Sequence, residues 1–256
     1  MPGQTRIDRR RFLLGGLQAA GFFLLAGCDN LSQSQWFPQL LSKTEGLTRR
    51  AQRTLTSKDA LAKEYPEADL STVFPVNGET NPNNPVYHTL AQGNFADWKL
   101  EIGGLVQRPA RFSLTAIHAM PSRTQITRHD CVEGWSAIGK WKGVPLREFM
   151  EIVQPLPSAK YVVFRCADID DDQIPYYESI ALEEAYHPQT IMAYELNDVP
   201  LDMAHGAPLR LRVERQLGYK HAKYVMRIEL VESLDEIGGG RGGYWEDQGY
   251  EWYAGI

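Results

Sequence analysis

Cysteine is scarce in this chain of 256 residues, which has only Cys28, Cys131 and Cys166. Three cysteines allow at most one disulfide, and Cys131 with Cys166 is the candidate pair. They also offer no C-x₂₋₄-C pair of the kind that zinc sites use. The sequence therefore gives no sign of a disulfide framework or of a closed zinc site.

An excess of positive charge is also lacking. Lys and Arg total 27 against 32 Asp and Glu, so that the formal net charge is −5. This balance argues against a general binder of nucleic acid or of anionic membranes. We expect no nucleic-acid partner, and any anion site must be local.

Nucleotide-binding loops and repeats are missing as well. No G-x-G-x-x-G follows an expected strand, no G-x-x-x-x-G-K-[ST] occurs, and no haem-attachment C-x-x-C-H is present. Hydrophobic residues make up 43% of the chain, which is enough for one sizeable core. We therefore expect a single main domain without an internal repeat.

The first 28 residues are typical of an export signal. Arg9-Arg10-Arg11 directly precede Phe12-Leu13, as in a twin-arginine signal, and an apolar run continues to residue 26. The run is too short for the roughly 20 apolar residues of a membrane span. Residues 25–28 resemble a lipobox ending in Cys28, although an ordinary cleavage site is the alternative. We expect a periplasmic protein, lipid-anchored if Cys28 is acylated.

The rest of the chain divides into three parts. Residues 29–73 are expected to form a tether and surface helices, and residues 74–235 the main domain, which begins with a long loop to residue 85. The tail, residues 236–256, is rich in glycine and aromatic residues. We expect the tail to dock on the domain, with a flexible linker as the alternative.

Hydrophobic periodicity in the domain favours an irregular mixture of strands and helices. Alternating or short apolar runs predict strands at 98–102, 125–128, 161–164, 209–213 and 224–230, and helices are expected at 144–150 and 180–186. Because strands and helices do not alternate regularly, the predicted class is α+β with mixed sheets and short helices.

The most informative motif surrounds Cys131, in the run Arg-His-Asp-Cys-Val-Glu-Gly-Trp-Ser at 128–136. A cysteine between acidic residues and histidine, at the end of a predicted strand, is placed as a metal ligand would be. A buried core thiol, a zinc ligand and a nucleophile activated by His129 are the alternatives.

A local excess of basic residues lies further along. Residues 209–227 contain six Arg or Lys and one acidic residue, which predicts an anion site. Arg210 can form two parallel bonds to an oxyanion, and Lys223 can act as a point charge. We expect Arg212 to lie on the opposite face of this strand, away from the site. A solvated basic strand face is the alternative.

An acidic run at 168–172 begins like a calcium-binding loop. Gln173 stands where the turn needs glycine, and Ser179 where the loop needs a closing glutamate. We therefore interpret these residues as a solvated loop.

Two blocks, Cys-Val-Glu-Gly-Trp-Ser at 131–136 and Trp-Lys-Gly-Val-Pro-Leu at 141–146, resemble a known family in this order. The family is that of the sulfite oxidase-type molybdopterin-binding domain, shared by sulfite oxidases and bacterial periplasmic methionine-sulfoxide reductases. The blocks at 205–210 and 218–223 continue the resemblance, which extends over residues 74–232.

The resemblance implies one molybdenum on one molybdopterin, with the Cys131 thiolate as the protein's metal ligand. It places the pyranopterin phosphate near His205, Arg210 and Lys223. The full set of cofactor-binding residues that it implies is Asn77, Cys131, Cys166, His205, Arg210, His221, Ala222 and Lys223. His221 and Ala222 would contribute backbone contacts, and Cys166 departs from the family's threonine. Glu133 is the further catalytic candidate, as a group that orients an oxyanion or water.

The function implied is oxygen-atom transfer on a small sulfoxide or sulfite-type substrate, or on methionine sulfoxide. Electrons would be exchanged with a separate redox protein, such as a haem-bearing membrane protein or a cytochrome. A monomer is expected, because no immunoglobulin-like dimerisation domain follows. The alternative is a non-catalytic exported lipoprotein that binds a phosphorylated ligand.

Overall fold

The computed structural model describes residues 60–170 and 172–256. By its contacts the chain divides into two units, residues 1–52 and residues 53–256, and the second is described below. The predicted export signal, Cys28 and most of the predicted tether lie outside the described residues. Within the described ranges, no helix is both long and apolar enough to cross a membrane.

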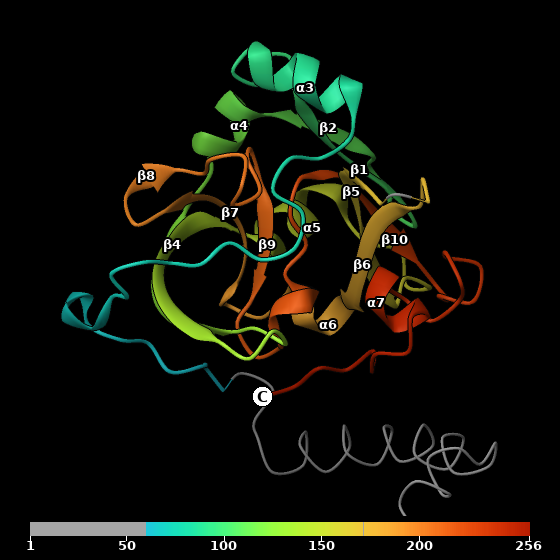
Figure 1. Cartoon of the computed structure of the whole chain (residues 1–256). Coiled ribbons are helices and arrows are strands. Elements are labelled where there is room, and N and C mark those ends of the chain that lie inside the picture. Colours follow the sequence, from blue (N-terminus) through green and yellow to red (C-terminus); the bar gives the residue numbers. More distant parts are fainter. Residues whose placement is uncertain (1–59, 171) are drawn as a thin grey trace, which may run out of the picture. The chain divides into compact units, whose positions relative to one another are not determined.

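Two five-stranded sheets form the domain (Figure 1). The first has the order β2 (Ala110–Ser113), β1 (Lys99–Gly104), β10 (Val225–Val231), β5 (Tyr161–Ile169) and β6 (Pro175–Ala181). The second has the order β3 (Arg123–Asp130), β4 (Ser136–Pro145), β7 (Thr190–Leu196) and β8 (Val199–Pro200), and β9 (Arg210–Val213) also pairs with β7. Strands β1 and β10 run parallel, whereas their other neighbours in the first sheet are antiparallel. The predicted α+β class with mixed sheets is confirmed.

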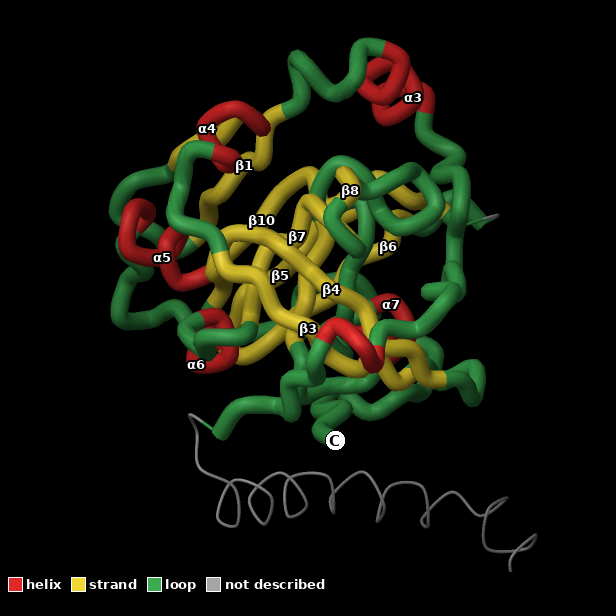
Figure 2. The backbone as a smooth tube through the Cα atoms, turned by 90° about the vertical axis from the view of Figure 1, so that its left-hand side faces the viewer, coloured by secondary structure: helices red, strands yellow, loops and turns green. Residues whose placement is uncertain are grey.

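Short helices lie outside the strands (Figure 2). They are α3 (Pro85–Gln92), α4 (Leu114–His118), α5 (Leu146–Val153), α6 (Leu182–Ala185) and α7 (Tyr244–Asp247), with 3₁₀ turns η1 (Glu67–Asp69) and η2 (Gly218–Lys220). Helix α5 begins after Pro145, near the predicted start, because proline is favoured at the beginning of a helix. The helix predicted at 180–186 is shorter than expected, since its first two residues complete strand β6.

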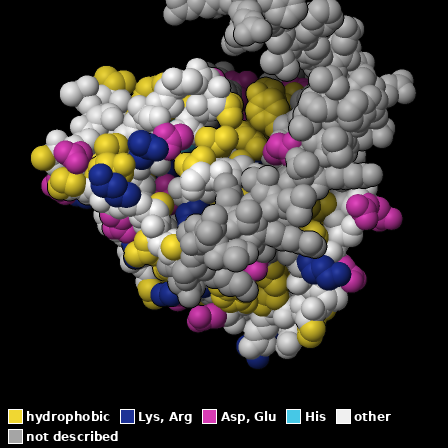
Figure 3. Space-filling view, turned by 90° about the horizontal axis from the view of Figure 1, so that it is seen from below, with side chains coloured by type: hydrophobic (Ala, Val, Ile, Leu, Met, Phe, Trp, Pro, Cys, Tyr) yellow, Lys and Arg dark blue, Asp and Glu magenta, His cyan; other side chains and the backbone are white. Residues whose placement is uncertain are grey.

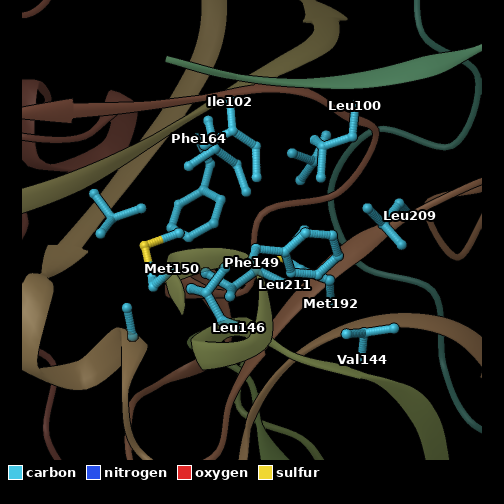
Figure 4. Close-up of a cluster of buried hydrophobic side chains, with 14 of the residues drawn as sticks. Leu100, Ile102, Val144, Leu146, Phe149, Met150, Phe164, Met192, Leu209 and Leu211 are labelled. Carbon is cyan, nitrogen blue, oxygen red and sulfur yellow. The ribbon is translucent and has the colours of Figure 1, made fainter. Parts of the chain in front are cut away.

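The main hydrophobic core joins both sheets to α5 (Figure 4). Helix α5 turns Leu146, Phe149, Met150 and Val153 inward, at the i, i+3, i+4, i+7 spacing of one helical face. Each such side chain contributes about 1.5–3 kcal/mol when it is fully buried. This core holds β5 and β10 of one sheet against β4, β7 and β9 of the other.

A smaller core surrounds Trp141 on β4. Its ring makes an edge contact with Phe74, at 5.1 Å between centroids. Residues 70–84, which precede α3, have no regular structure, as predicted for most of this segment, and Phe74 fixes them to the second sheet. The backbone bearing Asn77 therefore lies next to strands that come much later in the sequence.

Gly143 allows a close approach between β4 and β7. A Cβ atom at this position would overlap the backbone of Met192 and Ala193, which cannot move without breaking the strand pairing. Gly103 on β1 is different, because a Cβ there would meet only the end of the Arg227 side chain, at 3.9 Å.

Replacing Gly143 by alanine should lower the free energy of unfolding by about 1–3 kcal/mol through overpacking. Gly103→Ala is the matched control and should change it by less than about 1 kcal/mol. Chemical denaturation of both variants measures the difference. Equal stabilities would contradict the close approach of β4 and β7.

Candidate active site

Cys131 stands at the first position of the turn between β3 and β4. Its N–H donates to the carbonyl of Trp135 at 2.9 Å, and its carbonyl accepts from the N–H of Gly134 at 3.1 Å. Gly134 has a φ of 90°, which glycine adopts at little cost. The turn therefore presents the cysteine side chain at a fixed place beyond the strand end.

The thiol of Cys131 is free and half-buried. Burial raises its pKa, while hydrogen bonds from the backbone N–H groups of Glu133 and Val132 to the sulfur act in the opposite direction. These two amides are oriented to stabilise a thiolate. A metal cation would add the favourable charge that the thiolate lacks here.

Cys131 opens onto a cavity of about 180 Å³. Five of the predicted site residues line this cavity: Asn77, Cys131, Glu133, His221 and Lys223. They come from the loop before α3, the β3–β4 turn and the segment after η2. The remaining predicted residues, Cys166, His205, Arg210 and Ala222, do not line it.

Lys223 binds together the loops around the cavity. Its Nζ donates to the carbonyls of Asn77 at 2.6 Å, Ala204 at 3.0 Å and Glu79. Burial, and then the positive charge of Arg210, lower the pKa of Lys223 to about 7. No described carboxylate forms an ion pair with it, although the charges of Asp168 and Glu79 favour its protonated form, and the amine holds the loops through the three carbonyls.

Arg210 on β9 is fully buried. Its Nη1 donates to the carbonyl of His205 at 3.0 Å and its Nη2 contacts the carbonyl of His221 at 3.5 Å, while Nε has no partner among the described residues. Burial, and then the charge of Arg212, lower the pKa of Arg210 to about 9. A buried cation without a carboxylate partner is unfavourable, and a bound anion would relieve it.

Arg212 does not lie on the opposite face from Arg210, and that prediction is wrong. Residues two apart on a strand point to the same face, and both guanidinium groups lie over the ring of Trp141, at 4.9 Å for Arg210 and 4.3 Å for Arg212. Arg212 is fully buried and forms two bonds to Glu214, at 2.9 and 2.6 Å. Its charge is therefore neutralised within the protein, whereas that of Arg210 is not.

His205 is held by other protein groups. Its Nδ1 lies 2.8 Å from Asp202 Oδ1, and its Nε2 lies 3.2 Å from the carbonyl oxygen of Phe74. Both ring nitrogens thus have partners, and the contact with Arg210 is made by the His205 carbonyl. The role predicted for the His205 side chain at a phosphate stays a prediction.

Cys166 lies on β5 opposite Val225 of β10. Its thiol is free, and burial raises its pKa well above the usual range. The candidate disulfide with Cys131 is not formed. Ala222 is buried beside β9, where its carbonyl accepts from the N–H of Leu211 at 2.8 Å.

Asp168 was interpreted as part of a solvated loop, and this is wrong. It lies on β5, is only 8% exposed and lines the cavity beside Lys223 and His221. Asp172, further along the run, is exposed in the turn before β6, so the acidic run includes both a buried strand residue and an exposed turn residue. The only indication of this strand in the sequence was the apolar pattern of residues 161–164, and the strand predicted from it ended before Asp168.

Aromatic residues of the C-terminal segment also line the cavity. The sequence led us to expect that this segment docks on the domain, but not that it forms part of this site. Tyr244 and Trp245 lie on α7, and the Tyr244 hydroxyl donates to Asp170 Oδ2 at 2.7 Å. The ring of Tyr176 on β6 lies 5.5 Å from that of Tyr244. Residues 244–245 therefore form part of the wall, next to strands from the middle of the chain.

A buried ionic cluster fixes this wall. Lys220 of η2 donates to Glu246 of α7 at 2.5 Å and to Glu178 of β6, and all three side chains are almost fully buried. Burial and the neighbouring Glu246 raise the pKa of Glu178 well above its usual range, against the effect of Lys220. The cluster joins η2, whose Gly218 and Tyr219 line the cavity, to the C-terminal segment.

Comparison with protein families decides the assignment. Residues 87–236 match the model of the oxidoreductase molybdopterin binding domain. The chain belongs to this family. It is a molybdopterin-dependent oxidoreductase of the sulfite oxidase type, and its cofactor is molybdenum on molybdopterin, as the sequence motifs predicted.

Two curated members are similar over different lengths. A putative protein-methionine-sulfoxide reductase subunit of Azospira oryzae is 37% identical over 96% of this chain and 87% of its own length. The protein-methionine-sulfoxide reductase catalytic subunit of Xanthomonas axonopodis is 37% identical over 54% of this chain and 46% of its own length. The aligned part therefore spans about half the length of the latter reductase.

Among solved structures, the sulfane dehydrogenase SoxCD of Paracoccus pantotrophus matches with a TM-score of 0.49 and 22% identity. That match covers 58% of this chain and 45% of SoxCD.

The described residues fit a molybdopterin in three respects. The half-buried thiol of Cys131 could serve as the protein ligand, and the buried Arg210 has an unpaired donor suited to a phosphate. The cavity also has polar side-chain atoms without partners, at Asp168 and His221. When bound, the cofactor supplies the two-electron chemistry of the metal, and the protein supplies binding and orientation.

Arg210→Ala and Arg212→Ala should fail in different ways. Loss of Arg210 removes a buried, uncompensated cation, so the variant should fold. It should bind the cofactor more weakly, by about 1.5–3 kcal/mol of binding free energy, and therefore retain less of it. Loss of Arg212 leaves the buried Glu214 unpaired and should lower the free energy of unfolding by about 3–5 kcal/mol.

Molybdopterin content and thermal unfolding, measured on both variants, separate the two effects. If Arg212→Ala were as stable as the parent, the structural role of the Arg212–Glu214 pair would be refuted. If Arg210→Ala retained its full pterin content, Arg210 would not bind the phosphate.

Proposed function

We propose that this oxidoreductase removes the oxygen atom from a neutral sulfoxide of the methionine-sulfoxide class, at a molybdenum bound by Cys131. The charge of the cavity carries this proposal. Its lining contains carboxyl groups at Glu79, Glu133 and Asp170, a further carboxyl at Asp168 whose pKa is raised to about 7 by burial, and one amine, at Lys223. A sulfite dianion entering this cavity would meet like charges, whereas a neutral sulfoxide would not.

The outer part of the cavity supports the same class of substrate. Val132, Ile174 and Trp245 line it and keep exposed fractions of 45%, 46% and 37%. These apolar side chains suit the methylene groups of methionine, and a sulfur atom packs favourably beside an aromatic ring. The names of the relatives from Azospira and Xanthomonas agree with this substrate class.

Glu133 is the candidate for orienting water or the sulfoxide oxygen. Its Oε2 accepts from the indole N–H of Trp135 at 3.0 Å, within the turn that presents Cys131. This hydrogen bond holds the carboxylate, which lies two residues after Cys131 in the sequence. The side chain of Glu133 is exposed and lines the cavity. Reduction of a sulfoxide to a thioether and water consumes two protons and two electrons, and Glu133 is placed where it can help to deliver the protons.

The electrons require a partner, and we propose a separate haem-bearing membrane protein or cytochrome for this role. Membership in an oxidoreductase family favours the enzyme over the alternative of a non-catalytic lipoprotein. On the face shown in Figure 3, Lys and Arg side chains lie scattered beside Asp and Glu. A monomeric state remains part of the proposal.

The purified holoenzyme should reduce methionine sulfoxide and should oxidise sulfite poorly. In Cys131→Ser, reduction should fall to background, because a serine hydroxyl is a harder and far less acidic ligand than a thiol. A reduced dye as electron donor makes the rate measurable without the natural partner. Cys166→Ser is the matched control and should keep substantial activity.

Two results would contradict this proposal. Turnover by Cys131→Ser at the parental rate would refute the metal ligand. Faster oxidation of sulfite than reduction of methionine sulfoxide would refute the substrate class.

We also propose export to the periplasm through the twin-arginine route, with lipidation of Cys28. Replacing Arg9 and Arg10 together by lysine should leave the protein in the cytoplasm, since the signal requires the paired arginines. Cell fractionation measures the distribution, and intact-mass analysis of the membrane fraction detects acyl groups on Cys28. Normal periplasmic levels of the double variant would refute the route, and a mature chain without acyl mass would refute lipidation.

A further inference from the structure

Helix α7 carries Tyr244 and Trp245 of the cavity wall and packs against β6 (Figure 1). Of its four residues only Glu246 is buried, whereas Tyr244 and Asp247 are half-buried and Trp245 is exposed. A helix at the surface of a domain is usually held by an apolar stripe. Here a carboxyl group takes that place, so the attachment of α7 depends on the charges around Glu246.

The chain on both sides of α7 can change direction. Glycines with a positive φ flank the helix, namely Gly240 at 85°, Gly242 at 95° and Gly249 at 105°. Glycine adopts and leaves such conformations at little cost, which suits a hinge. Beyond the glycines the segment is fixed, because the Tyr177 hydroxyl donates to the carbonyl of Ile237 at 3.1 Å and the N–H of Leu217 donates to the carbonyl of Ala254 at 2.9 Å. Helix α7 therefore lies between two fixed ends with glycines on either side.

The charges of the cluster that holds Glu246 do not balance. The Nζ atom of Lys220 donates to Oε1 of Glu246 at 2.5 Å and also to Oε1 of Glu178. These three side chains are at most 1% exposed. With both carboxyl groups ionised, one negative charge would be buried without a partner, and the two carboxylates would repel each other. One additional proton makes the cluster neutral.

The oxygen atoms that Lys220 does not reach indicate where this proton can reside. Oε2 of Glu178 and Oε2 of Glu246 are both buried and have no hydrogen-bond partner among the described residues. An ionised carboxylate needs partners for both oxygens, whereas a protonated carboxyl keeps its proton on one of them. Burial raises the pKa of Glu178 well above its usual range, and the neighbouring Glu246 acts in the same direction, although Lys220 opposes them.

The surroundings of the cluster supply no second cation among the described residues. The titratable and charged groups packed around it are Tyr176 and Tyr177 on β6, Arg165 and Cys166 on β5, Tyr219 on η2, and Asp170 and Asp247. Burial raises the pKa of the β6 phenols and of the thiol, so these groups are neutral. Arg165 pairs with Glu229 at 3.3 Å, and Asp247 is itself acidic. A backbone N–H and the Tyr244 hydroxyl lower the pKa of Asp170, which stays ionised.

We propose that α7 is a lid of the cavity, and that its closure takes up one proton, which Glu178 and Glu246 retain. When α7 leaves, Lys220 and Glu178 remain as a neutral ion pair, while Glu246 ionises in water and releases the proton. The hydrogen bond from Tyr244 to Asp170 is also broken. This inference concerns access to the cavity and does not depend on the metal ligand or the substrate proposed above.

The direction of the pH dependence follows from this proton. The closed lid binds one proton more than the open lid, so a rise in pH favours opening. Closure is strongest below the ordinary pKa of a glutamate, about 4.3, and weakens by about ten-fold for each pH unit above it. The weakening ends where the pH passes the raised pKa of the closed cluster.

Hydrogen–deuterium exchange of the backbone amides of residues 244–250 measures the lid in the full-length holoenzyme. These amides lose protection on opening, since a helix of four residues does not persist away from the domain. Between about pH 5.5 and 7.5, protection corrected for the intrinsic exchange rate should fall by about ten-fold per pH unit. The amides of β5 should keep constant protection. Equal protection of residues 244–250 at all pH values would overturn the proposal.

Glutamine variants identify the residues that hold the proton. Glu246→Gln and Glu178→Gln each leave Lys220 with a single carboxylate, so the closed cluster is neutral without an additional proton. Protection of the lid should then be independent of pH in both variants. Asp247→Asn, on the same helix, is the matched control and should keep the parental slope. A parental slope in either glutamine variant, or loss of the slope in Asp247→Asn, would refute the assignment of the proton to this cluster.

Discussion

Two buried guanidinium groups, of Arg210 and Arg212, lie over the indole of Trp141, and the charge of each must be compensated in an environment without water. The charge of Arg212 is neutralised by an ion pair with Glu214. Arg210 contacts only backbone carbonyls and lies beside the second cation, Arg212. A low-dielectric environment makes such an isolated charge costly. The guanidinium of Arg210 also contacts the carbonyls of His205 and His221, and His221 lines the cavity. One buried cation therefore both holds part of the cavity wall and favours a bound anion.

The sequence predicted those parts of the site whose residues are neighbours along the chain. The turn at Cys131 follows from a strand pattern ending in Asp-Cys-Val-Glu-Gly, and the start of α5 follows from Pro145. The basic residues near 210–223 were also recognised, because their excess is visible against a net negative chain. Local pattern and composition are sufficient for features of this kind.

Other parts depend on which segments meet in space, and these were missed. In the sequence, Asp168 resembles the first residue of a polar turn. In the structure, β10 pairs with β5 as far as Cys166, near the end of that strand, and Asp168 belongs to the strand. Arg212 was misassigned although the period of two already places it with Arg210. The aromatic wall at Tyr244 and Trp245 comes from a glycine-rich segment, and no periodicity there indicates which strands it will cover.

The cluster of Lys220, Glu178 and Glu246 has a consequence for the order of events in synthesis. Two of its members lie on segments that are translated before residue 221, but the third is on α7. Until α7 has left the ribosome, Lys220 and Glu178 have no second carboxylate, and the wall made by Tyr244 and Trp245 is open. The cluster can therefore be completed only after Glu246 has been synthesised, so that this wall of the cavity is among the last parts of the domain to be fixed.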